Sequence, residues 1–293
     1  MHQMVQAALP CLCFARNGTA VPPPPWAPPG AGPGSRLELR GGTDAPMAPP
    51  IDYLRFVLVP LLQKRLGLIG LGIHLQRRGY YPKGGGHVSL HVPTLDSALP
   101  PLVMVERGQV VALRGYAYAA GAAWPPDTGA RLLASARSAL RDDAGAGLRG
   151  VPFLEDDSRD GGATPSIGAG AGILLVAETS TGCLLGATAA AEVKGATPEQ
   201  VGKAAAERLL AELATGACLD QHAADQVIIY MGLARGRSTV LIGPPTLHTT
   251  TAAWVQERFG VTFTFEPSPD VPGCTLMSCE GMGYGHPPGL GPG

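Results

Sequence analysis

The sequence has few aromatic residues, no long apolar run and no excess of either charge. Aromatic side chains make up 5% of the 293 residues and hydrophobic residues 45%, so a buried core must rely on aliphatic side chains. No apolar run reaches the roughly eighteen residues that a membrane-spanning helix needs. The first residues, Met1 to Met4, place no basic segment ahead of an apolar stretch. We therefore expect no secretory signal and a soluble, intracellular chain.

The cysteines form no C-x-x-C pair, and their spacings match neither a zinc site nor a disulfide framework. We expect reduced and mostly buried thiols. Two of them, Cys11 and Cys13, alternate like residues on one face of a β-strand, which would bring their thiols close together. We interpret this pair as packing. The six cysteines are Cys11, Cys13, Cys183, Cys218, Cys274 and Cys279.

The charges nearly cancel, with 22 basic residues against 23 acidic residues and a formal net charge of −1. Proteins that bind long nucleic acids usually carry a basic excess, because neutralisation of phosphates supplies most of the affinity. The balance therefore argues against an extended nucleic-acid cradle. It leaves room for a small site that holds one end of a strand.

Two segments have the composition of irregular structure. Residues 21–34 contain seven prolines and three glycines, which cannot maintain a helix or a strand ladder. We expect a surface loop or a disordered insertion there. The glycine- and proline-rich residues 281–293 predict a flexible tail.

Between these segments, strand and helix patterns alternate. The predicted strands are 37–39, a hairpin over 72–92 that turns through Gly84–Gly86, 105–118, 173–177 paired with 183–186, 238–242 and 261–265. The predicted helices are 51–65, 127–142, 197–215 with Thr197 as its cap, 220–236 with Asp220 as its cap, and 249–259. Helices mixed with antiparallel hairpins predict an α+β or mixed α/β fold.

The helix after Asp220 begins with three polar residues at i, i+3 and i+4, namely His222, Asp225 and Gln226. This spacing stacks an imidazole, a carboxylate and an amide on one helical face. The rest of that helix is apolar and therefore buried, so the polar group must find partners in the protein or in a ligand. Spacing alone favours the plainer alternative, an ordinary helix start that faces water.

A histidine, His248, lies between the strand that ends near Ile242 and the helix that begins near Thr249. The positive end of a helix dipole disfavours the imidazolium form, which leaves a nitrogen lone pair for attack. The same helix end offers backbone N–H groups to a phosphate. A nucleophile and a phosphate site would coincide, although a lone loop histidine is more often structural.

The segment from Arg77 to Gly86 interleaves basic and aromatic residues, a composition that suits phosphates and stacked bases. Its three successive glycines do not form a Walker A loop, because no Gly-Lys-Ser or Gly-Lys-Thr follows. From composition alone, a tight turn with solvated flanks is the better interpretation.

Several segments together resemble the RNA 3'-terminal phosphate cyclase family, in an order and spacing that fit from Gln6 onward. The run R-G-Y-Y-P-K-G-G-G is the most specific of them. The segments are Gly41–Tyr53, Arg78–Gly86, Ala177–Cys183, His222–Gln226 and Gly243–Thr249.

The resemblance implies a fold of repeated βαβαββ units with a smaller α/β domain inserted. Residues 1–105 and 201–293 would form the cyclase core, and residues 106–200 the inserted domain. The family's early E-G-G-G-Q-I-L-R motif is absent, so we expect the first repeat to be missing. Because a lost repeat would bare sheet edges, we expect this chain alone to be a poor enzyme.

The resemblance also implies a chemistry in which a histidine attacks the α-phosphate of ATP. AMP then passes to an RNA 3'-phosphate, and the 2'-hydroxyl closes a 2',3'-cyclic phosphate. The implied assignments are His248 as nucleophile, Asp225 and Gln226 as nucleotide contacts, Gln6 near the nucleotide, Pro49 near the adenine and His222 where the family usually has a tyrosine.

ATP, a divalent cation (Mg or Mn) and RNA with a 3'-terminal phosphate are the implied ligands, with no membrane partner. A nuclear location follows only from eukaryotic relatives, with the cytoplasm as the alternative. No pattern indicates an oligomeric state. Three other functions stay open: a non-catalytic cyclase-like factor in ribosomal RNA processing, a carboxylvinyl-transferase-type enzyme on a similar fold, and an inactive fragment.

A further departure from the family pattern is His87, which follows the triple glycine where the family usually has glutamate.

Overall fold

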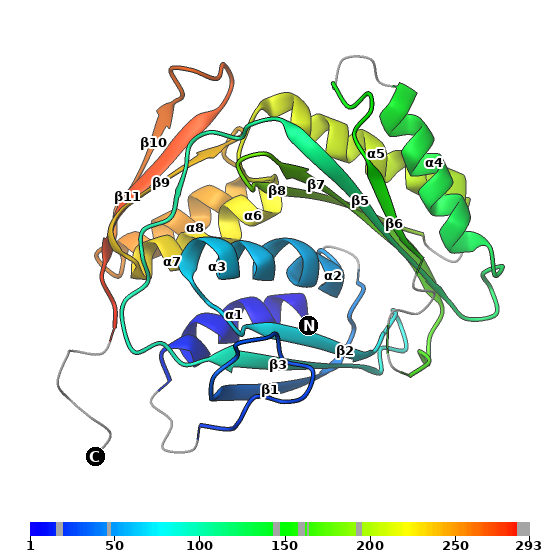
Figure 1. Cartoon of the computed structure of the whole chain (residues 1–293), viewed down its shortest axis with the longest axis horizontal. Helices are drawn as coiled ribbons and strands as arrows, with labels where there is room; N and C mark the ends of the chain where they lie inside the picture. Colours follow the sequence, from blue (N-terminus) through cyan, green and yellow to red (C-terminus); the bar gives the residue numbers. More distant parts are fainter. Residues whose placement is uncertain are drawn as a thin grey trace.

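The computed structural model describes residues 1–15, 20–45, 48–142, 147–157, 162, 164–191 and 195–285. Three sheets and the helices packed between and over them build the described fold, and Figure 1 shows how they are arranged. The predicted α+β class is confirmed. In these residues no helix combines the length and the apolar character needed to cross a bilayer.

The first sheet is antiparallel, in the order β1-β3-β2. The predicted hairpin over 72–92 is confirmed, and the predicted strand 37–39 is the centre of a longer strand. Val88, Leu90 and Val92 are fully buried. The strands are β1 (Gly34–Gly41), β2 (Gly72–Arg77) and β3 (Gly86–Pro93).

A helix, α1 (His2–Cys13), occupies the start of the chain, so the interpretation of Cys11 and Cys13 as alternate strand residues is wrong. Val5, Leu9 and Cys13 recur every four residues and are buried, which is the stripe of an amphipathic helix. Residues two apart do not share a helix face. Cys11 is accordingly exposed while Cys13 is buried.

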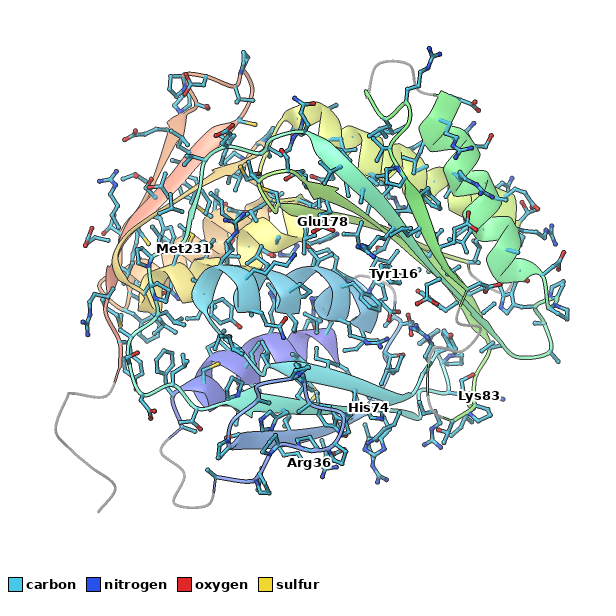
Figure 2. The ribbon with its side chains drawn as sticks, in the orientation of Figure 1. Arg36, His74, Lys83, Tyr116, Glu178 and Met231 are labelled. Atoms are coloured by element: carbon cyan, nitrogen blue, oxygen red, sulfur yellow. The ribbon has the colours of Figure 1, made fainter. Side chains whose placement is uncertain are left out.

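The predicted helix over 51–65 is confirmed as a continuous helical run with a π-helical centre. It consists of α2 (Ile51–Tyr53), the π-helical η1 (Leu54–Leu58) and α3 (Val59–Leu66). This run and α1 lie between the first sheet and the second (Figure 1). Tyr116 of the second sheet stacks on Phe56, with ring centroids 3.8 Å apart, on the side that faces these helices (Figure 2).

The proline-rich segment 21–34 is a surface loop, as predicted, and it packs on the first sheet. Val21 bridges to Gly34, where β1 begins. The Trp26 ring stacks on His74 with centroids 5.3 Å apart, and His91 Nε2 lies 2.9 Å from the Gly32 carbonyl oxygen. The segment therefore covers part of a sheet face instead of extending away from the fold.

The second sheet has the order β6-β5-β7-β8, and α4 and α5 cover one of its faces. The capping box of Thr197 and Gln200 is confirmed at the start of α5. The predicted division into 1–105, 106–200 and 201–293 stays a prediction, and its boundary at 200 falls inside α5. The elements are β5 (Val110–Ala120), α4 (Thr128–Asp142), β6 (Phe153–Asp157), β7 (Gly170–Thr179), β8 (Leu184–Ala191) and α5 (Pro198–Thr215).

The third sheet has the order β10-β11-β9-β4. The strand β11 was not predicted, and its last two residues belong to the predicted tail, whose residues 286–293 lie outside the described residues. The predicted helix 220–236 is divided at Val227 and ends at Leu233. The elements are β4 (Val103–Met104), α6 (Gln221–Gln226), α7 (Ile228–Leu233), β9 (Arg235–Ile242), α8 (Leu247–Glu257), β10 (Phe263–Pro267) and β11 (Thr275–Met282).

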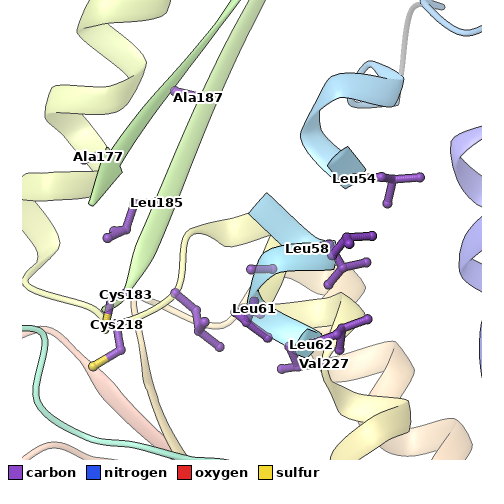
Figure 3. Packing of buried hydrophobic residues seen from close by; sticks show 14 of the residues in the cluster. Leu54, Leu58, Leu61, Leu62, Ala177, Cys183, Leu185, Ala187, Cys218 and Val227 are labelled. Carbon is purple, nitrogen blue, oxygen red and sulfur yellow. The ribbon is translucent and has the colours of Figure 1, made fainter. Parts of the chain in front are cut away.

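One core joins these layers. Leu58, Leu61 and Leu62 from the central helical run belong to the same cluster as Leu185 of β8 and Val227 between α6 and α7 (Figure 3). All five side chains are at most 3% exposed. The central helical run therefore fixes α6 relative to the second sheet, and α6 carries three of the candidate site residues.

Candidate active site

The start of α6 is held by Asp220, a fully buried carboxylate. Its Oδ1 accepts hydrogen bonds from the backbone N–H groups of His222 and Ala223, each at 2.9 Å. The same oxygen accepts from the Tyr53 hydroxyl at 2.6 Å, and Oδ2 accepts from the Gly186 N–H at 2.7 Å. One side chain thus caps α6 and ties it to α2 and to β8.

The start of α8 is capped by Thr246, whose Oγ1 accepts from the Thr249 N–H at 3.2 Å. The helix begins at Leu247, two residues before the predicted start, because the cap is Thr246. His248 is therefore the second residue of the helix and not a loop residue, and its side chain is exposed. The predicted placement of this histidine at a helix N-terminus is confirmed.

A cavity of about 420 Å³ lies between α1, residues 48–49, α6 and the start of α8. All six residues that the sequence nominated line it: Gln6, Pro49, His222, Asp225, Gln226 and His248. They come from positions up to 242 residues apart in the chain (6 to 248). Their individual roles stay predictions.

Six further residues line the cavity and were not predicted: His2, Gln3, Ala48, Thr188, Gln221 and Thr246. His2 could have been predicted from its position four residues before Gln6, because a helix over this segment places both residues on one face. Gln221 and Thr246 are sequence neighbours of predicted residues. Thr188 lies on β8, and no local pattern indicates it.

The buried ring of His2 hydrogen-bonds to the Pro50 backbone and to the Gln226 side chain. Among the described residues of this cavity, Oδ1 of Asp225 is a buried polar atom without a hydrogen-bond partner. Each unpaired buried polar group costs about 1–3 kcal/mol. Native proteins rarely tolerate such a group without a function. Oδ1 of Asp225 is therefore a candidate contact for a polar ligand.

Burial also shifts the titration of these groups. Burial and, to a smaller extent, the nearby His222 ring lower the pKa of His2 to about 4. Burial raises the pKa of Asp225 to about 6, although His248 acts in the opposite direction. It lowers the pKa of His222, which Asp220 opposes and which His248 and Arg208 reinforce. Near neutral pH the cavity therefore presents uncharged imidazoles at His2 and His222 beside an ionised Asp225.

The His222 ring packs edge-on against Tyr53, with centroids 5.6 Å apart and an interplanar angle of 79°. Tyr53 is fully buried and hydrogen-bonded to Asp220. The His222 imidazole is thus supported by a buried, hydrogen-bonded aromatic neighbour. That arrangement suits a flat ring as the cavity's ligand.

The hairpin segment 77–86 does not contribute to this cavity. Arg78 is 2% exposed and forms an ion pair of 2.6 Å with Asp52, with Asp44 at 3.4 Å. Its guanidinium also lies 4.1 Å from the centroid of the Tyr118 ring. Of the plainer interpretation, the turn agrees with the structure, but the solvated flanks are wrong, because Arg78 and Tyr80 are buried.

A family model described as RNA 3'-terminal phosphate cyclase matches residues 2–265. The chain belongs to the RNA 3'-terminal phosphate cyclase family. All six predicted site residues fall inside the matched range, and so do the caps of α6 and α8. The family match therefore covers the whole of the candidate site as the structure assembles it.

Curated relatives in the family are identical to this chain at about a third of the matched positions. An RNA 3'-terminal phosphate cyclase from Staphylothermus marinus is 36% identical over 256 residues, covering 87% of this chain and 65% of the relative. One from Desulfurococcus amylolyticus is 32% identical, covering 96% and 72%. A probable RNA 3'-terminal phosphate cyclase from Dictyostelium discoideum is 32% identical, covering 96% and 60%. The chain thus spans about two thirds of the length of these relatives.

Proposed function

We propose that this chain performs the ATP-dependent conversion of an RNA 3'-phosphate into a 2',3'-cyclic phosphate. The observation that carries the proposal is the single cavity that gathers Gln6, Pro49, His222, Asp225, Gln226 and His248. Family membership supports the same reaction. The buried, unpaired Oδ1 of Asp225 in this cavity fits a polar ligand.

In the first step, a ring nitrogen of His248 attacks the α-phosphorus of ATP. A P–N bond forms, the bond from that phosphorus to the bridging oxygen breaks, and pyrophosphate leaves with the electron pair. His248 suits this role because its side chain is exposed at the cavity and sits at the start of α8. The first turn of that helix carries positive partial charge, which stabilises the negative charge on the phosphoryl oxygens.

In the second step, an oxygen of the RNA 3'-phosphate attacks the same phosphorus, and the P–N bond to His248 breaks. In the third, the RNA 2'-hydroxyl oxygen attacks its neighbouring 3'-phosphorus and expels AMP, while its proton passes to solvent or to a nearby base. The protein's part in both steps is to hold the two phosphoryl groups in line, since orientation supplies much of the rate in such transfers.

The base and ribose would occupy the part of the cavity formed by α1, Pro49 and α6. His222, backed by Tyr53, offers a ring for the adenine to stack on, and Pro49 lines the same cavity. The side chains of His2 and Gln226, which hydrogen-bond to each other, line the same part of the cavity from buried positions. These residues bind and orient, and none of them needs to change protonation near neutral pH.

A divalent cation is part of the proposal, and the residues present fit one that arrives with the nucleotide. Among the described residues no group of three or more His, Cys, Asp or Glu side chains could hold a metal on its own. Of the described residues that line the cavity, Asp225 is the one with a carboxylate. Magnesium is commonly bound by one or two carboxylates together with substrate phosphates, and it neutralises their charge.

The decisive assay uses RNA that carries a labelled 3'-terminal phosphate. We expect the label to become resistant to phosphatase only when ATP and a divalent cation are present, and to remain sensitive with His248→Ala. An RNA that ends in a 3'-hydroxyl is the substrate control. Equal conversion by His248→Ala and the unchanged chain would contradict the proposal. The proposed nuclear location is tested separately by imaging the tagged protein in cells.

A further inference from the structure

Among the described residues, no lysine or arginine lines the candidate cavity. Its one carboxylate, Asp225, is ionised above a pKa of about 6. A ligand with phosphoryl groups would bring several negative charges to this place. Such charges are normally met by arginine, lysine or a cation, in addition to helix ends. A cationic side chain next to the cavity is therefore a candidate to bind those phosphoryl groups.

A second, smaller cavity of about 170 Å³ adjoins the first, and both are lined by Ala48 and Thr188. Its lining includes Arg208, an exposed residue in the middle of α5. The guanidinium donates a hydrogen bond from Nη1 to the Thr188 carbonyl oxygen. This bond anchors the side chain at the boundary between the two cavities.

Arg208 has no ion pair with any carboxylate of the described residues, whereas other cations nearby are paired. On the same helix, Lys203 lies 3.7 Å from Glu207, and the neighbouring Arg131 binds Glu199 at 2.6 Å. The charge of Arg208 nevertheless reaches the first cavity, because it contributes to lowering the pKa of His222. Within the described part of the chain, a positive charge without a carboxylate partner thus adjoins the predicted nucleotide site.

The one carboxylate in the second cavity is already engaged. Asp44 accepts hydrogen bonds from the Thr43 hydroxyl at 2.5 Å and from Arg78 at 3.4 Å. Burial raises its pKa in spite of Arg78, which reduces the negative charge that it would present to an anion. The remaining lining residues, Ala45, Pro50, Tyr118, Ala189 and Ala190 among them, carry no formal charge.

We propose that the second cavity is a phosphoryl subsite of the candidate active site, with Arg208 as its binding residue. The inference rests on the proposed function, because it takes the ligand of the first cavity to carry phosphoryl groups. With Nη1 engaged by Thr188, the other N–H donors of the guanidinium remain for a forked contact with phosphate oxygens. The phosphoryl group could come from the β- and γ-phosphates of ATP or from the 3'-end of the RNA.

Binding measurements on the full chain separate these sources. The probes are ATP against adenosine, and an RNA oligonucleotide with a 3'-phosphate against the same oligonucleotide with a 3'-hydroxyl, each with magnesium present. The variants are Arg208→Gln, Arg208→Lys and the control Lys203→Gln, which removes a charge from the same helix. Each comparison is internal to one variant, so a general loss of fold weakens both members of a pair alike.

We expect Arg208→Gln to weaken one phosphorylated probe by about tenfold to a hundredfold while its unphosphorylated partner is unaffected. Loss at ATP assigns the subsite to the β- and γ-phosphates, and loss at the 3'-phosphorylated RNA assigns it to the RNA end. Arg208→Lys should lose less affinity for that probe, since lysine keeps the positive charge but cannot donate two parallel hydrogen bonds. Lys203→Gln should change neither comparison.

Two results would overturn the inference. If Arg208→Gln keeps the full preference for both phosphorylated probes, Arg208 binds no phosphate, and the proposed function stands. If the unchanged chain itself shows no preference for ATP over adenosine or for the 3'-phosphate over the 3'-hydroxyl, there is no phosphoryl recognition to assign. That second result removes the proposed function as well.

Discussion

The buried carboxylate of Asp225 titrates within a pH range in which the unfolding of the chain can be measured. Its pKa is raised to about 6 in the folded chain, whereas an exposed aspartate titrates near 3.9. The folded state therefore binds the proton more tightly than the unfolded state between these two values. In this window the free energy of unfolding falls as the pH rises.

We predict that Asp225→Asn removes this part of the pH dependence, because the amide cannot ionise. Relative to the unchanged chain, the variant should gain about 1 kcal/mol of stability between pH 4 and pH 6.5, after allowance for the partial exposure of the carboxylate. Urea unfolding at several pH values in this range measures the difference. A constant difference across the range would show that Asp225 titrates normally.

For His2, the free energy of unfolding should change with pH in the opposite direction. Its pKa is lowered to about 4 by burial, against about 6.5 in an unfolded chain, so folding disfavours the charged ring. The stability that it contributes is present above pH 6.5 and is lost as the pH falls towards 4. With His2→Gln, which stays neutral, we expect up to about 3 kcal/mol less loss on acidification. An equal loss of the free energy of unfolding in both chains between pH 6.5 and pH 4 would refute this.

Among the helices and strands, α6 depends most on a single side chain. Asp220→Ala should destabilise the chain by about 3 kcal/mol or more, because it leaves four donors unpaired, among them the Tyr53 hydroxyl and the Gly186 N–H. Thermal unfolding measures the loss. As a matched control, Glu207→Ala removes an exposed carboxylate from α5 and should cost little. A loss below about 1 kcal/mol for Asp220→Ala would mean that the buried carboxylate contributes only an ordinary helix cap.

Most elements could be predicted from the sequence because their signals are local. The capping box at Thr197, the cap at Asp220 and the alternation of β3 each depend on residues a few positions apart. The errors arose where the local signal was ambiguous or absent. Cys11 and Cys13 fit a two-residue period by coincidence, and β11 pairs with β9 across more than thirty residues, 242 to 275, without a clear alternation of its own.

For the molecule as a whole, Arg78 connects three parts that are distant in sequence. It pairs with Asp52 of α2 and with Asp44 after β1, and it packs on Tyr118 of β5. We predict that Arg78→Met destabilises the fold by about 3–5 kcal/mol, because it leaves the buried Asp44 without its cation and Asp52 with only its ion pair to Arg55. Denaturant unfolding tests this, with the exposed Arg237→Met as control. Equal stability of the two variants would contradict the role of Arg78.

The candidate site is also a property of the whole molecule. Its six predicted residues could be nominated from family motifs and helix spacing, but neither predicts a cavity. The cavity depends on α1, residues 48–49, α6 and α8 meeting around the central helical run. Thr188 and His2 are examples of lining residues that the sequence does not predict. They reach the cavity because tertiary packing brings β8 and the start of α1 next to α6. No spacing rule places Thr188 within the same 420 Å³ as His248.

The most direct test of the central claim is covalent adenylation of His248. The full chain is incubated with α-labelled ATP and a divalent cation and then separated by denaturing electrophoresis, beside His248→Ala and the cavity-distant control His74→Ala. We predict label that survives denaturation in the unchanged chain and in His74→Ala, and none in His248→Ala. Label that persists in His248→Ala, or no label in the unchanged chain, would contradict the claim that His248 is a nucleophile in this cavity.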